Sequence, residues 1–185
     1  ERAAELGHAD AMNNLADMFL NGEGTNADEK LALYWFKKAA QENVVEAMFT
    51  LGIMYEQGIG VEVDEVKAFN YYESAALGGD LEGMLRMGTI YMTPLLHVKQ
   101  NMKEAIKYFE MAADADHIDA LYNLGYMYEN GIGVEVDAKA AIYYYETAAD
   151  FDDFGAIQAL IRIYSEGKIV ERNDLIAHHW KRRLV

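Results

Sequence analysis

Apolar residues recur at helical spacing in two successive segments in the first half of the chain. In residues 45–57 they stand three or four positions apart, which predicts one face of a helix that we term helix A. A second helix, helix B, is predicted from the N-cap Asp64 to about Leu77. The residues expected on its inner side are Val66, Phe69, Tyr72 and Ala76. Between the two helices, Gly58 and Gly60 permit the backbone angles that end a helix and turn the chain.

This helical hairpin is repeated along the chain with a period of 36 or 37 residues. Ala-Ala pairs mark the period, beginning at Ala3, Ala39, Ala75, Ala112 and Ala148. Helix A is expected again over 9–21, 81–91, 118–130 and 154–166, and helix B over 28–40, 101–113, 137–149 and 173–183. Such a period predicts an all-α fold, a right-handed α-solenoid of antiparallel helix pairs in which the A helices line a concave groove.

The same register divides a single solenoid domain, residues 1–185, into repeats. Their expected bounds are 9–44, 45–80, 81–117, 118–153 and, for an atypical C-terminal repeat, 154–185. Residues 1–8 match the end of a repeat, so we expect them to close a preceding repeat of a longer array whose native N-terminus lies upstream. In the third repeat Pro94 replaces the first loop glycine, and we expect that loop to differ in shape.

Small and aromatic residues alternate in the predicted packing positions. Glycines inside helices A, at Gly52, Gly88 and Gly125, each cost about 1 kcal/mol relative to alanine, which close approach of a neighbouring helix can offset. Aromatic residues recur at one helix A position and one helix B position, for example Tyr55 and Tyr71. We interpret both sets as packing residues.

The repeat from Ala47 to Leu77 resembles the Sel-1-like repeat, a relative of the tetratricopeptide repeat. The resemblance is carried by Leu51-Gly52, Tyr55, Gly58-x-Gly60-Val61, Asp64, Lys67-Ala68, Tyr71 and Ala75-Ala76, and the loop is reproduced at Gly131–Asp137. It covers essentially the whole chain. It implies a scaffold or adaptor for protein partners, and we expect the groove lined by the A helices to bind a protein or peptide. No serine, histidine and carboxylate constellation and no cysteine nucleophile can be read from the sequence, so we expect no enzymatic activity, and we expect no cofactor.

Charge and composition narrow the classes of partner. The chain has 16 basic and 31 acidic residues, a formal charge of −15, which disfavours nucleic acid and favours a basic or amphipathic peptide. It contains no cysteine, which excludes disulfides and thiolate metal sites. No apolar run approaches the roughly 18 residues of a transmembrane segment, so we expect a soluble chain of undetermined compartment.

The candidate binding residues are the helix A positions predicted to face neither helix B nor the next repeat. They are Asn13, Asp17, Phe49, Ile53, Leu85, Thr89, Tyr122, Tyr126, Gln158 and Arg162. The apolar members, Phe49, Ile53, Leu85, Tyr122 and Tyr126, are expected to form an exposed patch. The acidic residues expected around it are Asp17, Glu46, Glu56, Glu82, Asp119 and Glu129. Alanine at Phe49 and Tyr122 is expected to abolish partner binding with little change in stability.

Other polar residues favour structural readings. Asn14 and Asn123 could bond a peptide backbone, but occur in two of five repeats. Asp150, Asp152 and Asp153 fit no calcium loop and are interpreted as turn and cap residues, and His178-His179 lack a third metal ligand. Two alternatives to the scaffold stay open. One is a penicillin-binding hydrolase, which the resemblance to cysteine-rich relatives suggests but the missing cysteines disfavour; the other is a self-associating array.

Overall fold

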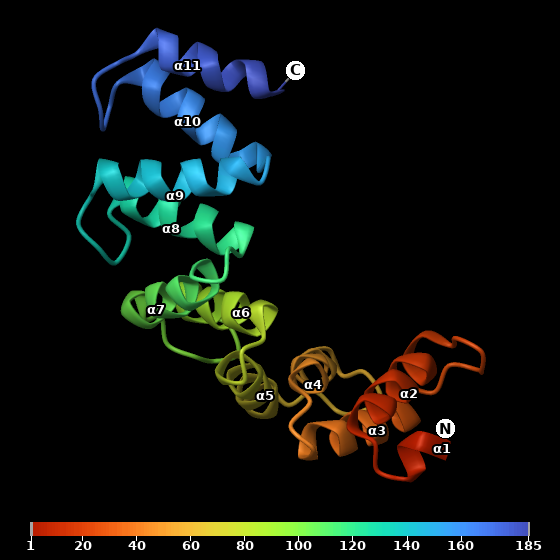
Figure 1. Ribbon diagram of the computed structural model, residues 1–185. Coiled ribbons are helices and arrows are strands. Elements are labelled where there is room, and N and C mark those ends of the chain that lie inside the picture. The colour runs from red at the N-terminus through yellow and green to blue at the C-terminus, as the bar shows by residue number, and fades with distance from the viewer. Residues whose placement is uncertain (1, 185) are drawn as a thin grey trace. The chain divides into compact units, whose positions relative to one another are not determined.

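The computed structural model describes residues 2–184, and every regular element in that range is helical (Figure 1). Glu1 and Val185, the outer ends of the predicted segments 1–8 and 154–185, lie outside the described residues. The helices are α1 (Arg2–Glu5), α2 (Ala9–Asn21), α3 (Glu29–Gln41), α4 (Val45–Gln57), α5 (Glu65–Leu77), α6 (Leu81–Met92), α7 (Met102–Ala113), α8 (Ile118–Asn130), α9 (Ala138–Asp150), α10 (Phe154–Glu166), α11 (Asp174–Lys181) and the 3-10 helix η1 (Arg182–Leu184).

The chain divides into two compact units, residues 1–100 and residues 101–185, which are described separately. In the first unit α2 packs against α3 and α4 against α5, and each helix B also contacts the helix A that follows it. The second unit repeats this arrangement with the pairs α8–α9 and α10–α11. The predicted class, an all-α solenoid of antiparallel helix pairs, is confirmed.

Each helix B begins at a side-chain cap that the sequence predicts. The Asp64 carboxylate accepts a hydrogen bond from the Lys67 amide at 3.0 Å, and the Asp64 amide donates to the Tyr55 carbonyl at 2.9 Å. Asp137 repeats both contacts, with the Ala140 amide at 3.0 Å and the Tyr128 carbonyl at 3.0 Å. One residue therefore starts helix B and joins it to the end of helix A.

The two loop glycines have separate roles. Gly58 ends α4 in the left-handed conformation, with φ of 76°. Gly60 lies against the start of α3, where a Cβ atom would come within 2.5 Å of the Glu29 carbonyl oxygen. In the second unit Gly133 meets Met102, at the start of α7, in the same way. The second glycine therefore allows the loop to pack on the preceding helix B.

Glycine is required inside helix A because an aromatic ring of helix B packs directly against the backbone there. A Cβ atom on Gly52 would lie 2.5 Å from the Tyr72 ring, and one on Gly125 would lie 2.8 Å from the Tyr145 ring. The predicted close approach is thus confirmed at both positions, and the group that approaches is a tyrosine side chain of helix B. Beside it Tyr55 stacks on Tyr71, with ring centroids 5.6 Å apart and an interplanar angle of 11°.

Two local expectations have different outcomes. The loop of the third repeat differs as predicted, because α6 ends at an extended Thr93, and Leu96 and His97 take positive φ angles of 49° and 56°. The prediction that Val66 lies on the inner side of helix B is wrong, since Val66 is 71% exposed. The buried face of α5 consists of Ala68, Tyr72, Ala75 and Ala76, and a residue two positions before Ala68 points to the opposite side of a helix.

Candidate functional site

The ten candidate binding residues lie at two recurring positions of the A helices, divided between the two units. Asn13, Asp17, Phe49, Ile53, Leu85 and Thr89 belong to the first unit, and Tyr122, Tyr126, Gln158 and Arg162 to the second. We call each group the A surface of its unit. None of the ten is buried, and Tyr126, Gln158 and Arg162 are exposed.

The expected exposure of the apolar patch holds only at Tyr126. Phe49, Ile53, Leu85 and Tyr122 are half-buried. The Phe49 ring packs against Tyr72 and the Tyr122 ring against Tyr145, each with centroids 5.6 Å apart. Both aromatic residues therefore stabilise the hairpin as well as presenting an edge to solvent, so their replacement by alanine would also remove packing.

A partly buried polar network lies beneath the A surface of the first unit. Glu56, in the last turn of α4, accepts a 2.6 Å hydrogen bond from the Tyr72 hydroxyl and an ion-paired hydrogen bond from the Arg86 guanidinium of α6. The guanidinium also lies 5.4 Å from the centre of the Tyr72 ring. Burial, and then the bond to Glu56, raise the pKa of Tyr72 well above its ordinary value. This first network joins two consecutive A helices through the intervening helix B.

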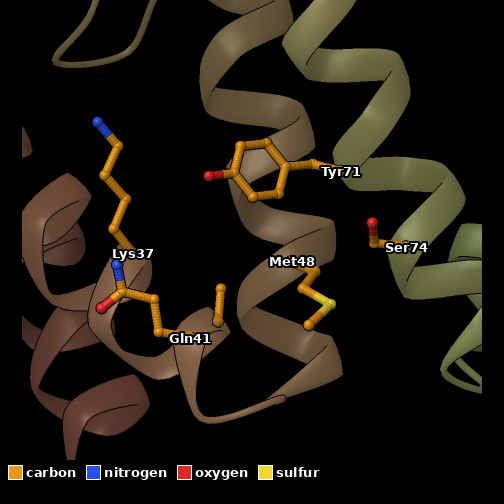
Figure 2. Close-up of a pocket in the computed structure, with 6 residues that line it drawn as sticks. Lys37, Gln41, Met48, Tyr71 and Ser74 are labelled. Atoms are coloured by element: carbon orange, nitrogen blue, oxygen red, sulfur yellow. The ribbon is translucent and has the colours of Figure 1, made fainter.

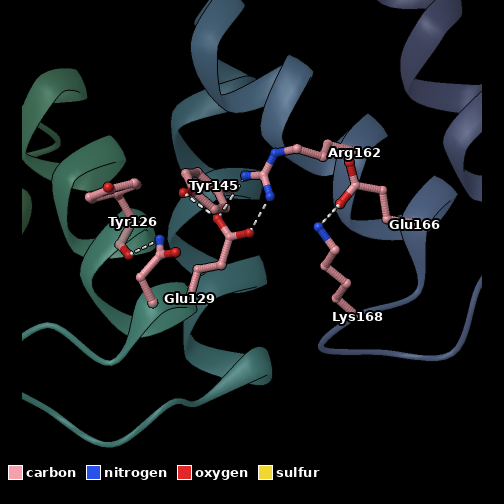
Figure 3. A network of polar contacts seen from close by, with 7 residues as sticks. Tyr126, Glu129, Tyr145, Arg162, Glu166 and Lys168 are labelled. Carbon is pink, nitrogen blue, oxygen red and sulfur yellow. Dashed lines mark hydrogen bonds and ion pairs between the residues drawn. The ribbon is translucent and has the colours of Figure 1, made fainter.

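The second unit contains a corresponding network of Glu129, Tyr145 and Arg162 (Figure 3). The Tyr145 hydroxyl donates to Glu129 at 2.9 Å, and Arg162 binds both carboxylate oxygens at 2.5 and 2.8 Å. Glu129 is only 8% exposed. Burial raises the pKa of Tyr145, and the bond to Glu129 raises that of Arg162. The paired geometry satisfies a carboxylate that burial alone would destabilise.

The networks change the expected charge around the patch. Glu56 and Glu129 are neutralised by arginines within the chain. Glu46, Glu82 and Asp119 are exposed. Asp17 is half-buried, and burial followed by repulsion from Glu23 raises its pKa. The acidic border of the A surfaces is therefore weaker than a count of carboxylates suggests.

Cavities open beside both networks. In the first unit Phe49, Ile53 and Gln57 border a cavity of about 310 Å³, with the first network as its wall. In the second unit Gln158 and Arg162 border a cavity of about 430 Å³, together with residues of α11 and η1. Each A surface thus includes a concave region lined by predicted binding residues.

Sequence reasoning missed the two networks, although the repeats contain a signal for them. In the second and fourth repeats the penultimate residue of helix A is glutamate and helix B carries tyrosine sixteen positions later, in the pairs Glu56–Tyr72 and Glu129–Tyr145. The corresponding pairs of the first and third repeats are Leu20–Phe36 and Met92–Phe109. Polar residues thus replace apolar ones at two positions together. An internal alignment could have found this coupling.

The remaining polar candidates have structural roles. Asp153 caps α10, accepting from the Ala156 amide at 2.6 Å, and Asp152 pairs with Arg183 at 2.8 Å. These contacts confirm the reading of the aspartates as turn and cap residues. Within residues 2–184, no three or more His, Asp or Glu side chains are arranged to hold a metal ion. No helix of that range has both the length and the apolar character that crossing a membrane requires.

Comparison with known proteins agrees with the repeat architecture. The profile of the Sel1 repeat matches five segments, residues 9–44, 45–80, 81–117, 118–150 and 159–182. The chain therefore belongs to the Sel1 repeat family, whose members are commonly non-enzymatic scaffolds for protein–protein interaction. No curated protein matches the chain.

Solved structures of the same fold differ in how far they extend beyond this chain. A Sel1 repeat protein from Oxalobacter formigenes is 31% identical, with a TM-score of 0.84 over 96% of this chain and 72% of its own. A protective antigen of uropathogenic Escherichia coli that displays the same fold is 32% identical, with a TM-score of 0.92 over 98% of this chain. This chain spans 39% of that antigen. Helicobacter pylori cysteine-rich protein B, 24% identical with a TM-score of 0.56 over 72% of this chain and 98% of its own, shares the fold alone.

Proposed function

We propose that the chain is an interaction scaffold that binds a basic or amphipathic peptide segment of a protein partner on its A surfaces. The observation that carries this proposal is the cavity of about 310 Å³ bordered by Phe49 and Ile53. A single apolar side chain of a partner would fit there, with its burial supplying the affinity. The net charge of −15 favours basic residues on either side of it.

Arg86 supports a peptide ligand for the same cavity. Its Nε atom is buried and has no hydrogen-bond acceptor among the residues that the structure describes. A buried donor without an acceptor costs about 1–3 kcal/mol. Once the Arg86 side chain turned toward the cavity, a backbone carbonyl of a bound peptide would supply that acceptor, and its recognition would not depend on the peptide's side chains.

The proposal can be tested with a peptide library displayed on phage and selected on the immobilised chain. We expect enriched peptides that combine lysine or arginine with a large apolar residue. Their binding should fall at least about tenfold in the double variant Ile53→Glu and Tyr126→Glu, because both changes place a charge where apolar surface is buried. We chose these residues instead of Phe49 and Tyr122 because the rings of Phe49 and Tyr122 pack against tyrosines of helix B, so their replacement would also disturb the core.

A matched control places the same charges outside the A surfaces. Val66 is 71% exposed and Tyr143 is 63% exposed, and both lie on B helices. The double variant Val66→Glu and Tyr143→Glu should bind the selected peptides as the wild-type chain does. Equal loss of binding in both variants, or no enrichment over an uncoated surface, would contradict the proposal.

A further inference from the structure

A separate cavity lies between two B helices of the first unit. It measures about 220 Å³ and is lined by Lys37, Ala40 and Gln41 of α3, Met48 of α4, and Tyr71 and Ser74 of α5. Figure 2 shows Lys37 and Gln41 on one side, Tyr71 and Ser74 on the other, and Met48 between them. It shares no residue with either A surface. Its volume suits a ligand about the size of one side chain, below the range typical of drug-sized ligands.

The rim of this cavity carries hydrogen-bond donors and the floor is apolar. The Lys37 ammonium lies 5.4 Å from the Tyr55 ring centre and forms no ion pair with any described residue. Burial raises the pKa of Tyr71, so its hydroxyl keeps the proton and can donate. The Gln41 amide adds further donors, while Met48 and Ala40 offer only apolar contact.

The repeat register supplies an internal comparison for this space, at positions 109 residues later in the second unit. There Arg183 stands in the place of Ser74, and Glu146 and Asp150 in the places of Lys37 and Gln41. The Arg183 guanidinium donates to Asp152 at 2.8 Å and to the Ala149 carbonyl at 2.7 Å, and lies 3.7 Å from Asp150. In the second unit Arg183 of η1, which directly follows α11, therefore joins the end of α9 and the turn after it by the chain's own contacts.

The first unit lacks that internal bridge. Ser74 is too short to cross the space, and its hydroxyl donates to the Asn70 carbonyl at 2.8 Å within its own helix. The opposite side carries a cation where the second unit carries acids. The cavity thus combines an open volume with a positive group that is not paired to a carboxylate. An anionic ligand is its complement.

We propose that the α3–α5 cavity binds a single carboxylate attached to a small apolar body. The carboxylate would accept hydrogen bonds from Lys37, with Tyr71 or Gln41 as a second donor, and the apolar body would lie on Met48. The acidic chain around the cavity disfavours a doubly charged anion such as phosphate. A free small acid and the C-terminal residue of a polypeptide both carry this chemistry.

The first arm of the test uses 3-phenylpropionate and the chain labelled at its methionine methyl groups. The Met48 methyl resonance, assigned with Met48→Leu, should shift in a saturable manner with the acid and not with 3-phenylpropionamide. Lys37→Gln should raise the Kd about tenfold, because a charge-assisted hydrogen bond is lost. Lys38→Gln is the matched control. Lys38 is exposed and lies over the Tyr34 ring, so its loss should leave the Kd unchanged within about twofold.

The second arm distinguishes the two sources of the carboxylate with a short peptide ending in phenylalanine, as the free acid and as the C-terminal amide. Binding of the peptide acid at least as tight as that of 3-phenylpropionate assigns the site to a polypeptide C-terminus. Binding of the small acid alone assigns it to a free metabolite-sized acid. Equal binding of acids and amides, an unchanged Kd in Lys37→Gln, or no saturable shift up to about 10 mM would overturn the proposal.

Discussion

The two polar networks occupy corresponding places in the two units but obtain their arginine from different turns. An offset of 73 residues relates Glu56 to Glu129 and Tyr72 to Tyr145. The same offset relates Arg86 to Ala159, whereas Arg162 corresponds to Thr89. The arginine has therefore moved by one helical turn between the units, while the glutamate–tyrosine pair has stayed in register.

The different arginine positions show that a carboxylate beneath the A surface requires a nearby cation. A long guanidinium side chain can reach the same carboxylate from either of two turns, so the presence of the cation matters more than its position. The two networks differ in how deeply the carboxylate is buried. The Glu129 side chain is 6% exposed and bound by two nitrogens, whereas the Glu56 side chain is 23% exposed. The second network therefore depends more strongly on its arginine.

The largest difference in stability between the two networks is expected when the arginine of each is removed. Arg162→Ala leaves Glu129 buried without a cation and should lower the free energy of unfolding by about 3 kcal/mol. Arg86→Ala leaves a carboxylate that water partly reaches, and should cost about 1 kcal/mol. Urea denaturation followed by far-ultraviolet circular dichroism measures both. Equal losses would show that the difference in burial does not govern stability.

The apolar repeats provide the control for this experiment. A triple variant, Glu129→Met, Tyr145→Phe and Arg162→Thr, introduces the Met92–Phe109 pair of the third repeat and replaces the arginine by the residue that Thr89 provides at the same helix A position. Its stability should return to within about 1 kcal/mol of wild type, because replacing a whole buried ion pair by apolar groups is often neutral. A triple variant as unstable as Arg162→Ala would indicate that the network stabilises the fold in its own right.

The helical glycines extend the comparison to packing. Gly52→Ala and Gly125→Ala each insert a methyl group into a tyrosine ring, at 2.5 Å in the first unit and 2.8 Å in the second. We expect net losses of about 2 and about 1 kcal/mol, after the gain in helix propensity is included. Urea titrations of both variants measure the difference. In a Tyr72→Ala background Gly52→Ala should no longer destabilise, and a persistent loss there would assign the effect to another contact.

The dependence of folding stability on alkaline pH tests the raised pKa values of the two network tyrosines. Because burial raises the pKa values of Tyr72 and Tyr145, the folded chain keeps two phenolic protons that the unfolded chain loses above about pH 10. Stability should therefore fall as pH rises above that value, by about 1.4 kcal/mol per pH unit for each tyrosine. Tyr72→Phe or Tyr145→Phe should each remove one such contribution from the slope of urea stability against pH. An unchanged slope would show that the hydroxyl titrates equally in both states.

Most of the fold was predictable from the chain because its determinants are local. Asp64 and Asp137 cap helices by bonds to amides two or three residues away, and Gly58 ends a helix through its own backbone angle. The predicted A helices agree with the structure to within one residue, and the predicted B helices began at the cap itself. Val66 was misplaced because its first-turn position was read from hydrophobicity alone.

The site was less predictable because its decisive contacts join residues about 30 positions apart. The ten A-surface residues follow from helical position, and all are at least partly accessible. Neither the half-burial of Phe49 nor the use of Glu56 as a partner of Arg86 follows from that position. Both depend on how closely the neighbouring hairpin packs, which the spacing of apolar residues does not specify.

By itself, the amino-acid sequence determined the repeat period, the helical hairpins, their caps and the membership in the Sel1 repeat family. Tertiary structure alone decided which carboxylate each arginine binds, and that Arg183 of η1 joins the end of α9 and its following turn while Lys37 borders an open cavity. The physical reason is the distance over which each kind of interaction acts. Caps and glycine turns act within a few residues of backbone, whereas long charged side chains meet several neighbours, and only the packing of the next repeat selects among them.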